Sequence, residues 1–343
     1  MLPEMFQSET GFVRWLLKRV PGKARGLKLG IGDDAALVGV ESGQGVILKS
    51  DMSIENVHFK RRLHPPRSVG HRALARPLSD VAAMGATPRF ALVSLALSRR
   101  TPPGWTRELY AGLLALAARF GVTLVGGDVA VVSGRTLIDV IVTGEVAPGR
   151  ELRRSGAKPG DRIFVSGELG LAALGLRLLH SQGRLPRARQ LKSESDGRSR
   201  VTALQAHLYP EPRCMLGHFL SIRSLASASI DLSDGLSTDL HHLCEASGVG
   251  ARVWEELLPL PQAPQYAHRT LLRLALHGGE DYQLLFTVPR GKKIPSSLGG
   301  LPLRRIGEIQ GTREILLLAK DGRSSPLRPE GYDHFRHWRS NVS

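Results

Sequence analysis

The chain has 343 residues, of which 42% are hydrophobic and 5% aromatic, which is typical of a globular protein with a substantial core and room for two domains. Lysine and arginine outnumber aspartate and glutamate by 47 to 31, a net charge of +16, yet the basic residues form no aromatic-interleaved stripe and match no nucleic-acid-binding motif. Two cysteines without metal-ligand spacing argue against a disulfide framework, and no apolar run is long enough to cross a bilayer.

The amino-terminal residues show no targeting segment. They include Glu4 and Glu9 and lack the apolar core of a signal peptide, so we expect a cytoplasmic protein with no membrane partner. The positive charge then has two possible uses, a nucleic-acid surface or a basic shell that attracts anionic substrates. Because no nucleic-acid motif is present, we favour the second use.

The first part of the chain alternates apolar strands with amphipathic helices. Apolar residues at helical spacing predict a helix over 9–20, and the apolar run 46–48 predicts a buried strand. Ser50 and Asp51 would lie at the carboxyl end of that strand, where α/β proteins place ligands. Between these elements, Asp34 follows two glycines in an acidic turn.

The next helix carries another candidate ligand. Apolar residues in 68–84 follow a helical period that Gly85 would end, which places Asp80 on this helix. A strand over 122–125 would end at Gly126-Gly127-Asp128. The other elements expected in this half are a strand over 90–97, a helix over 102–120 and a strand over 137–146. Together they predict an α/β layer whose acidic residues share one edge of the sheet.

A shift to arginine, glycine and proline around 148–160 indicates a boundary between domains at 1–148 and 149–343. The polar, basic stretch 181–200 predicts a solvent-exposed loop without chemistry. The elements expected beyond the boundary are a strand over 162–165, a helix from about 169, a helix over 237–246, and strands over 283–288 and 314–319.

Carboxylates flanked by glycine, serine or short apolar residues recur along the chain. The windows around them, 30–38, 46–56, 78–88, 121–130, 229–240 and 277–286, hold eleven acidic residues but one basic residue, Lys49. A share proportional to composition would be about eight basic residues. Ordinary turn chemistry explains any single window, but acidic turns that consistently lack basic neighbours are typical of hard-cation sites.

The usual signs of covalent catalysis are absent from the sequence. There is no Gly-x-Ser-x-Gly elbow, no P-loop and no protein-kinase signature. Many hard carboxylates suit Mg²⁺ ions on a polyphosphate, because Mg²⁺ binds proteins through one or two carboxylates and completes its shell with water and phosphate oxygens. The pattern therefore favours phosphoryl transfer, in which the protein supplies mainly positioning and charge neutralisation.

The motifs form one ordered set, which is Gly30-Ile31-Gly32-Asp33-Asp34, Ser50-Asp51 followed by His58, Leu78-Ser79-Asp80, Gly126-Gly127-Asp128, Arg154-Ser155-Gly156-Ala157, Ile230-Asp231-Leu232-Ser233-Asp234-Gly235, Gly278-Gly279-Glu280-Asp281-Tyr282 and Gly331-Tyr332-Asp333-His334-Phe335. This set, spread over nearly the whole chain, resembles the thiamine-monophosphate kinase family of the aminoimidazole-ribonucleotide synthetase-like superfamily. The resemblance implies an α/β (α+β) fold of two domains, an N-terminal mixed sheet with helices on one face and a C-terminal α/β domain. It also implies a homodimer that makes thiamine diphosphate from thiamine monophosphate and ATP.

Matched motif by motif, the resemblance implies three sets of site residues. Mg²⁺ ions would be held by Asp34, Ser50, Asp51, Asp80, Asp128, Asp231 and Asp234. ATP would contact Tyr110, Gly127, Asp128, Arg154 and Ser233, and the match for Tyr110 rests on its spacing from Asp128 alone. Thiamine monophosphate would contact His58, Glu280 and Tyr332. No covalent nucleophile or general base is expected, because the acceptor is already a phosphate oxyanion; metal ions and Arg154 would offset the repulsion between two anions.

One residue departs from the family pattern, and two alternative functions stay open. Pro77 stands where the family usually has asparagine, which removes a backbone donor inside the helix expected over 68–84. The first alternative is another ATP-using enzyme of the superfamily; a selenide-using one would need a reactive cysteine near the amino terminus, whereas the first cysteine is Cys214. The second is a non-catalytic protein that binds phosphate or nucleic acid on this fold, but broken acidic motifs would be expected there, and here every acidic position is filled.

Overall fold

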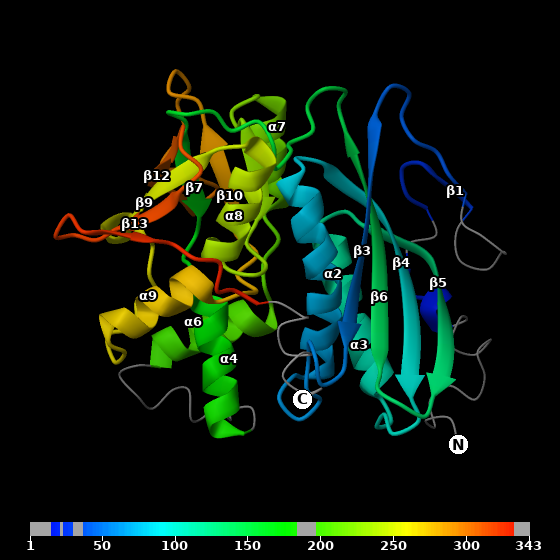
Figure 1. Cartoon of the computed structure of the whole chain (residues 1–343). Coiled ribbons are helices and arrows are strands. Elements are labelled where there is room, and N and C mark those ends of the chain that lie inside the picture. The colour runs from blue at the N-terminus through cyan, green and yellow to red at the C-terminus, as the bar shows by residue number, and fades with distance from the viewer. Residues whose placement is uncertain (1–14, 21–22, 30–36, 184–196, 333–343) are drawn as a thin grey trace, which may run out of the picture. The chain divides into compact units, whose positions relative to one another are not determined.

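The computed structural model describes residues 15–20, 23–29, 37–183 and 197–332 (Figure 1). The chain divides into two compact units. The first takes in the described residues up to Ala82 together with Ala86–Glu151, and the second takes in Ala83–Gly85 and, apart from Gly183, the described residues from Leu152 on. The acidic turn with Asp34 lies outside the described residues, and so does most of the helix expected over 9–20, of which 15–17 are helical.

The first unit is built on a four-stranded mixed sheet. Its order is β3 (Gly45–Ile54), β6 (Leu137–Val146), β4 (Thr87–Ser98), β5 (Thr123–Val132); β4 and β5 run parallel, and the other neighbours are antiparallel. Two short strands, β1 (Leu27–Leu29) and β2 (Leu37–Val38), pair separately. The mixed sheet predicted for this half is confirmed.

Two helices, α2 (Pro66–Ala83) and α3 (Trp105–Arg119), cover one face of this sheet (Figure 1). Side chains alternate along each strand, so Val93 and Val140 are buried on the helix-covered face. On the other face, Val46, Leu48 and Met52 of β3 are exposed. We call this second face the open face of the sheet.

Two strands are longer than predicted. β3 runs on to Ile54 and β5 to Val132, so Asp51 and Asp128 lie within strands rather than after them. Polar residues and glycines interrupt the apolar runs, but the ladders continue, with Asp51 opposite Val140. The predicted burial of β3 is also wrong, because β3 is an edge strand with one open face.

The helix predicted over 68–84 is confirmed as α2, which continues through Pro77. Pro77 has no N–H, so the carbonyl of Ala73 receives no helical hydrogen bond from this position. Gly85 follows the helix with a φ of 71°, a left-handed conformation that favours glycine. Pro77 therefore leaves Asp80 on the helix.

Two glycines allow α2 and α3 to cross closely. A Cβ on Gly70 would overlap the carbonyl of Leu109, and a Cβ on Gly112 would overlap the carbonyl of Arg67. We expect Gly70→Ala to lower the free energy of unfolding by about 3 kcal/mol, because the added methyl meets backbone that cannot move independently. Urea unfolding measures this, with Gly134→Ala as control, since a Cβ on Gly134 meets nothing within 4 Å. Equal stability of the two variants would contradict the close crossing.

The second unit is built on an eight-stranded sheet of order β14-β13-β9-β12-β7-β10-β8, with β11 paired to β12. The strands are β7 (Arg162–Ser166), β8 (Ala228–Asp231), β9 (Gly250–Trp254), β10 (Leu284–Val288), β11 (Ser297–Leu298), β12 (Leu301–Gln310), β13 (Ile315–Leu318) and β14 (Ser324–Pro326). Because β8 and β10 are neighbours, with Asp231 opposite Leu284, the acidic motif after β8 lies beside the segment that enters β10.

The helices of this unit are α4 (Leu171–Gln182), α6 (Gly197–Leu208), α7 (Cys214–Ile222), α8 (Leu236–Ser247) and α9 (His268–His277), with a short 3₁₀ turn η1 (Glu255–Leu257). The sequence predicted α4 and α8 but not α6, α7 or α9, and α6 begins inside the loop expected over 181–200. Within the described ranges, no helix combines the length and apolarity needed to cross a membrane. The cytoplasmic location expected from the sequence stays a prediction.

Candidate active site

The first unit brings together two of the predicted metal ligands. Asp51 on β3 and Asp80 on α2 both face Lys49, whose Nζ lies 3.8 Å from Asp51 Oδ2 and 3.1 Å from Asp80 Oδ2. On the other side of Asp51, Nη2 of Arg76 lies 3.0 Å from Oδ1. Asp51 therefore lies between two cations and shares one of them with Asp80.

These contacts correct the expectation that the acidic residues lack basic neighbours. Arg76 precedes Asp80 by four residues, so both project from one face of α2. Lys49 precedes Asp51 by two residues, so both project from one face of β3. Lys49 was already counted in the window 46–56, whereas Arg76 lies two residues before the window 78–88 and was therefore missed.

The electrostatics of Asp51 favour a bound cation. Burial raises the pKa of its carboxyl above the ordinary value, and the charges of Arg76 and Lys49 oppose that rise by favouring the anion. The nearby carboxylates of Asp80 and Asp139 add to the rise. A carboxylate cluster of this kind is stabilised by positive charge, whether from side chains or from a metal ion.

Strand register places two other predicted ligands on the open face. Successive strand residues point to opposite faces, so Ser50 points away from Asp51, and its hydroxyl donates a hydrogen bond to Asp139 Oδ1 at 2.8 Å. Asp128 pairs with Ser94, which pairs with Asp139, so Asp128 also belongs to the open face. The Ser50 hydroxyl and Asp128 therefore lie on the opposite face of the sheet from Asp51, although the register sets Asp128 and Asp139 in one row across the strands, and the shared edge stays a prediction.

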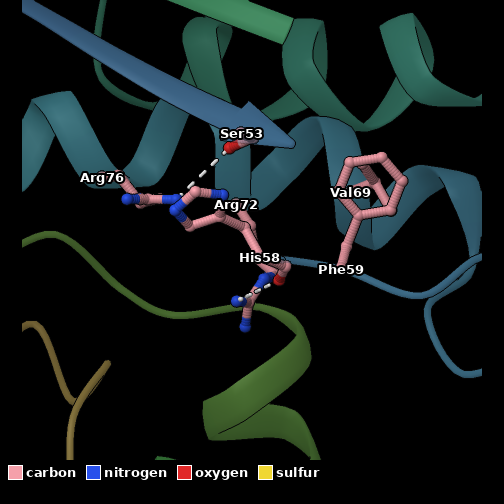
Figure 2. Close-up of a pocket in the computed structure, with 6 residues that line it drawn as sticks. All are labelled: Ser53, His58, Phe59, Val69, Arg72 and Arg76. Atoms are coloured by element: carbon pink, nitrogen blue, oxygen red, sulfur yellow. Dashed lines mark hydrogen bonds between the residues drawn. The ribbon is translucent and has the colours of Figure 1, made fainter. Parts of the chain in front are cut away.

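His58 lies in a tight turn after β3 and lines a pocket of the first unit (Figure 2). The pocket is lined by Ser53, His58, Phe59, Val69, Arg72 and Arg76. The N–H of Ile54 donates to His58 Nδ1 at 3.0 Å, so the neutral ring carries its proton on Nε2 and presents that N–H as a donor.

Two guanidinium groups give this pocket positive charge. Arg72 is 3% exposed and donates from Nη2 to the carbonyl of His58 at 3.3 Å, while Arg76 Nη1 lies 3.5 Å from Ser53 Oγ (Figure 2). With the His58 Nε2–H, these groups make the pocket rich in donors. Its chemistry suits an anionic or hydrogen-bond-accepting group.

Three motifs of the second unit meet around one turn, residues 231–235, between β8 and α8. Glu280 donates its backbone N–H to the carbonyl of Ser233 at 2.8 Å, and Tyr332 donates its backbone N–H to the carbonyl of Asp234 at 3.1 Å. The structure thus brings together the predicted residues Asp231, Ser233, Asp234, Glu280 and Tyr332 from distant parts of the chain.

The close approach of these segments explains their glycines. A Cβ on Gly331 would overlap the carbonyl of Asp234, and one on Gly279 would lie 2.6 Å from the carbonyl of Ser233. Glu280 itself has a φ of 69°, a left-handed conformation that is uncommon for residues other than glycine. Such conformations persist only where the surroundings hold them, and they often occur at functional sites.

Two carboxylates at these places carry no role predicted from the sequence. Asp139 was a single acid in an alternating apolar strand and gave no local signal. Asp239, 2% exposed, accepts the backbone N–H groups of Asp234 at 3.1 Å and Gly235 at 3.0 Å. Its position four residues after Gly235, at the start of a predicted helix, was a signal for such a cap. Burial, followed by the charges of Asp231 and Asp234, raises the pKa of Asp239 well above its ordinary value.

The remaining predicted ATP contacts have different surroundings. Arg154, in the second unit, is exposed. Gly127 has a φ of 150°, and a Cβ there would overlap the carbonyl of Val93, so glycine is required for the pairing of β4 with β5. Tyr110 is 1% exposed, and its ring packs edge-on against Trp15 with centroids 6.0 Å apart. The structure does not support the adenine contact expected for Tyr110, because the ring has almost no exposed surface.

Asp281 anchors the segment that carries Glu280, and its burial predicts a pH dependence of stability. Its carboxylate accepts the N–H groups of Gly170 and Ala172 at the start of α4, and burial raises its pKa to about 7. Because this pKa lies above the unfolded value of about 3.9, the folded state binds the proton more tightly, so this contribution to stability is present below pH 4 and is lost as the pH rises to 7.

We expect Asp281→Asn to flatten that dependence. Between pH 5 and pH 8 the wild type should lose about 2–3 kcal/mol more unfolding free energy than the variant, from two pKa units at 1.36 kcal/mol each. Urea unfolding at both pH values measures the difference. The exposed Asp321→Asn should keep the slope of the wild type, and an unchanged slope in Asp281→Asn would show that Asp281 does not titrate in this range.

Comparison with known proteins decides the family. The model of the AIR synthase related protein, N-terminal domain, matches residues 32–146, and the model of the corresponding C-terminal domain matches residues 158–318. The thiamine-monophosphate kinase of Bacillus subtilis (strain 168) is 35% identical over 316 residues, which cover 90% of this chain and 94% of that protein. The chain belongs to the thiamine-monophosphate kinase family.

Solved structures of the thiamine-monophosphate kinase family agree with this assignment. The crystal structure from Stenotrophomonas maltophilia K279a has a TM-score of 0.78 at 34% identity, covering 92% of this chain and 96% of that chain. AaThiL complexed with AMPPCP and TMP has a TM-score of 0.74 at 31% identity, covering 98% and 99%. The predicted resemblance, the two-domain fold and the assignment to a family of phosphotransferases are confirmed.

Proposed function

We propose that this chain transfers the γ-phosphoryl group of ATP to the phosphate of thiamine monophosphate, giving thiamine diphosphate. The observation that carries the proposal is the match along nearly the whole chain to AaThiL, which was solved with AMPPCP and TMP, taken here as an ATP analogue and thiamine monophosphate. The Asp51–Asp80 pair and the assembled residues of the second unit support it, because they supply the groups that this chemistry needs.

The carboxylates fit Mg²⁺. In the described part of the chain, no group of three or more His, Cys, Asp or Glu residues is placed to hold a metal ion, but Mg²⁺ commonly uses only one or two carboxylates. Asp51 and Asp80 already share one cation, the Lys49 ammonium, and their oxygens are the hard donors that Mg²⁺ prefers. Bound Mg²⁺ would neutralise phosphate charge and align donor with acceptor for in-line transfer.

The metal set that we propose has two groups, the Asp51–Asp80 pair of the first unit and the Asp231–Asp234 pair of the second. The other proposed metal ligands are Asp34, Ser50 and Asp128. Asp34 lies outside the described residues, and the Ser50 hydroxyl and Asp128 lie on the open face. For ATP we propose Gly127, Asp128, Arg154 and Ser233, without Tyr110.

The acceptor substrate combines a phosphate with a cationic ring system, and the chain carries groups that suit each part. The pocket at His58 supplies N–H donors and two guanidinium groups, which suit the phosphate. Glu280 supplies a carboxylate and Tyr332 an aromatic ring, which suit a thiazolium cation. We propose that these residues select the acceptor.

A coupled assay of ADP release with purified protein tests the proposal. We expect ADP release that requires both Mg²⁺ and thiamine monophosphate, with formation of thiamine diphosphate. ADP release that does not depend on thiamine monophosphate would favour another ATP-using enzyme of the superfamily. Binding of ATP without turnover on any phosphate acceptor would favour a non-catalytic phosphate-binding protein.

We propose a homodimer that forms through the open face of the first sheet. Leu48 on this face is 73% exposed, and Val46 and Met52, on the same face of β3, are also exposed. Such an apolar surface is typical of a protein–protein interface. Light scattering should give twice the chain mass for the wild type and the mass of one chain for Leu48→Glu; a monomeric wild type would contradict the proposal.

A further inference from the structure

One buried histidine faces the carboxylate that we propose for substrate recognition. His207 lies in the last turn of α6 and is 1% exposed. Its Nδ1 lies 3.4 Å from Glu280 Oε2. The Glu280 side chain remains 26% exposed, so it is held from the protein side while part of it faces solvent.

The backbone of Glu280 is fixed independently of this contact. Its φ of 69° and its hydrogen bond to the carbonyl of Ser233 place the start of the side chain. Two residues after Glu280, Tyr282 donates its N–H to the carbonyl of Leu232 at 2.9 Å. With the backbone fixed, the remaining freedom of Glu280 lies in its side-chain torsions, and the contact with His207 restricts these.

The connection that carries His207 holds the same segment at a second point. Arg213, between α6 and α7, donates from Nε to Gln283 Oε1 at 2.8 Å. Gln283 Oε1 also accepts the hydroxyl of Ser166 on β7 at 2.8 Å. Two residues of this connection therefore hold the two ends of the 280–283 segment, Arg213 at Gln283 and His207 at the Glu280 side chain.

We propose that His207 is a positioning residue, which orients the Glu280 carboxylate for the cationic part of the acceptor substrate. A neutral imidazole that donates Nδ1–H to Oε2 leaves the carboxylate negatively charged, and this charge is what the cationic part of the substrate would meet. Fixing the rotamer before binding removes an entropy cost that the substrate would otherwise meet. This role rests on the proposed function, and it adds a residue that does not itself touch the substrate.

Steady-state kinetics of two substitutions test the role. His207→Phe keeps a ring of similar volume but removes the donor; we expect the KM for thiamine monophosphate to rise about tenfold, the loss of one hydrogen bond to a charged group. The kcat and the KM for ATP should change less than twofold. His207→Asn, whose amide nitrogen is attached to Cγ as Nδ1 is, restores an N–H donor at that place and should recover most of the loss. The exposed His242→Asn on α8 serves as the matched control and should behave as wild type.

A double-mutant cycle separates positioning from a general structural role. In the Glu280→Gln background, His207→Phe should raise the KM for thiamine monophosphate by less than twofold, because the charge that it orients is gone. Additive effects, an equal rise in the KM for ATP, or no rise at all would overturn the inference while leaving the proposed function intact. A wild type that does not phosphorylate thiamine monophosphate would instead overturn the proposed function, and the role of His207 with it.

Discussion

Asp51→Asn is expected to reduce turnover by about 10²–10³-fold while the protein remains folded, since losses of this size follow when one group that stabilises transition-state charge is removed. Asp51 is the carboxylate shared by Lys49 and Arg76, and its neighbour Asp80 is the other proposed ligand. Asparagine has nearly the same shape and keeps an oxygen as acceptor for Arg76. It removes the negative charge, and with it the affinity for a divalent cation.

Two measurements separate this loss from misfolding. Thermal unfolding of Asp51→Asn should give a midpoint close to that of the wild type, and Mg²⁺ should raise that midpoint less than it does in the wild type. Glu108→Gln is the matched control, because Glu108 is a half-exposed carboxylate of the same unit that lies on α3 and pairs with Arg67 at the start of α2. It should retain full activity. Wild-type turnover by Asp51→Asn at saturating Mg²⁺ would remove Asp51 from the metal site.

The elements that could be predicted from the sequence are those with an uninterrupted period. β4 and β6 alternate over ten or more residues, and α2 keeps its helical stripe through Pro77. β3 and β5 were predicted too short, because each places polar residues or glycines where the strand passes the site. The amphipathic signal is weakest where side chains are chosen for chemistry rather than for packing.

The candidate site could be predicted as a set of residues but only partly as an arrangement. The motifs identified Asp51 and Asp80, which lie together in the first unit. They also identified Asp234, Glu280 and Tyr332, which lie together in the second unit. They did not show which way each side chain points, although a period of two already requires neighbouring strand residues to lie on opposite faces. Their cationic and buried partners depend on long-range packing, which no local window contains.

Asp234→Asn should reduce turnover about as strongly as Asp51→Asn, yet leave stability unchanged or slightly higher. The assembly around residues 231–235 depends on the backbone of Asp234, whose N–H donates to Asp239 and whose carbonyl accepts from Tyr332. These bonds do not involve its side chain. The Asp234 charge raises the pKa of Asp239, so removing that charge relieves repulsion within the unliganded site.

At neutral pH and without Mg²⁺, the free energy of unfolding of Asp234→Asn should therefore equal that of the wild type or exceed it by up to about 1 kcal/mol. Functional sites are commonly less stable than they could be, so removing a functional charge can raise stability. Gly331→Ala provides the contrasting variant. It leaves every carboxylate in place, but its methyl group would overlap the carbonyl of Asp234 and push Tyr332 from the turn. We expect Gly331→Ala to raise the KM for thiamine monophosphate while retaining metal-dependent turnover. If Asp234→Asn were instead as unstable as a cavity-forming core variant, its carboxylate would be structural, and the metal group proposed for the second unit would fail.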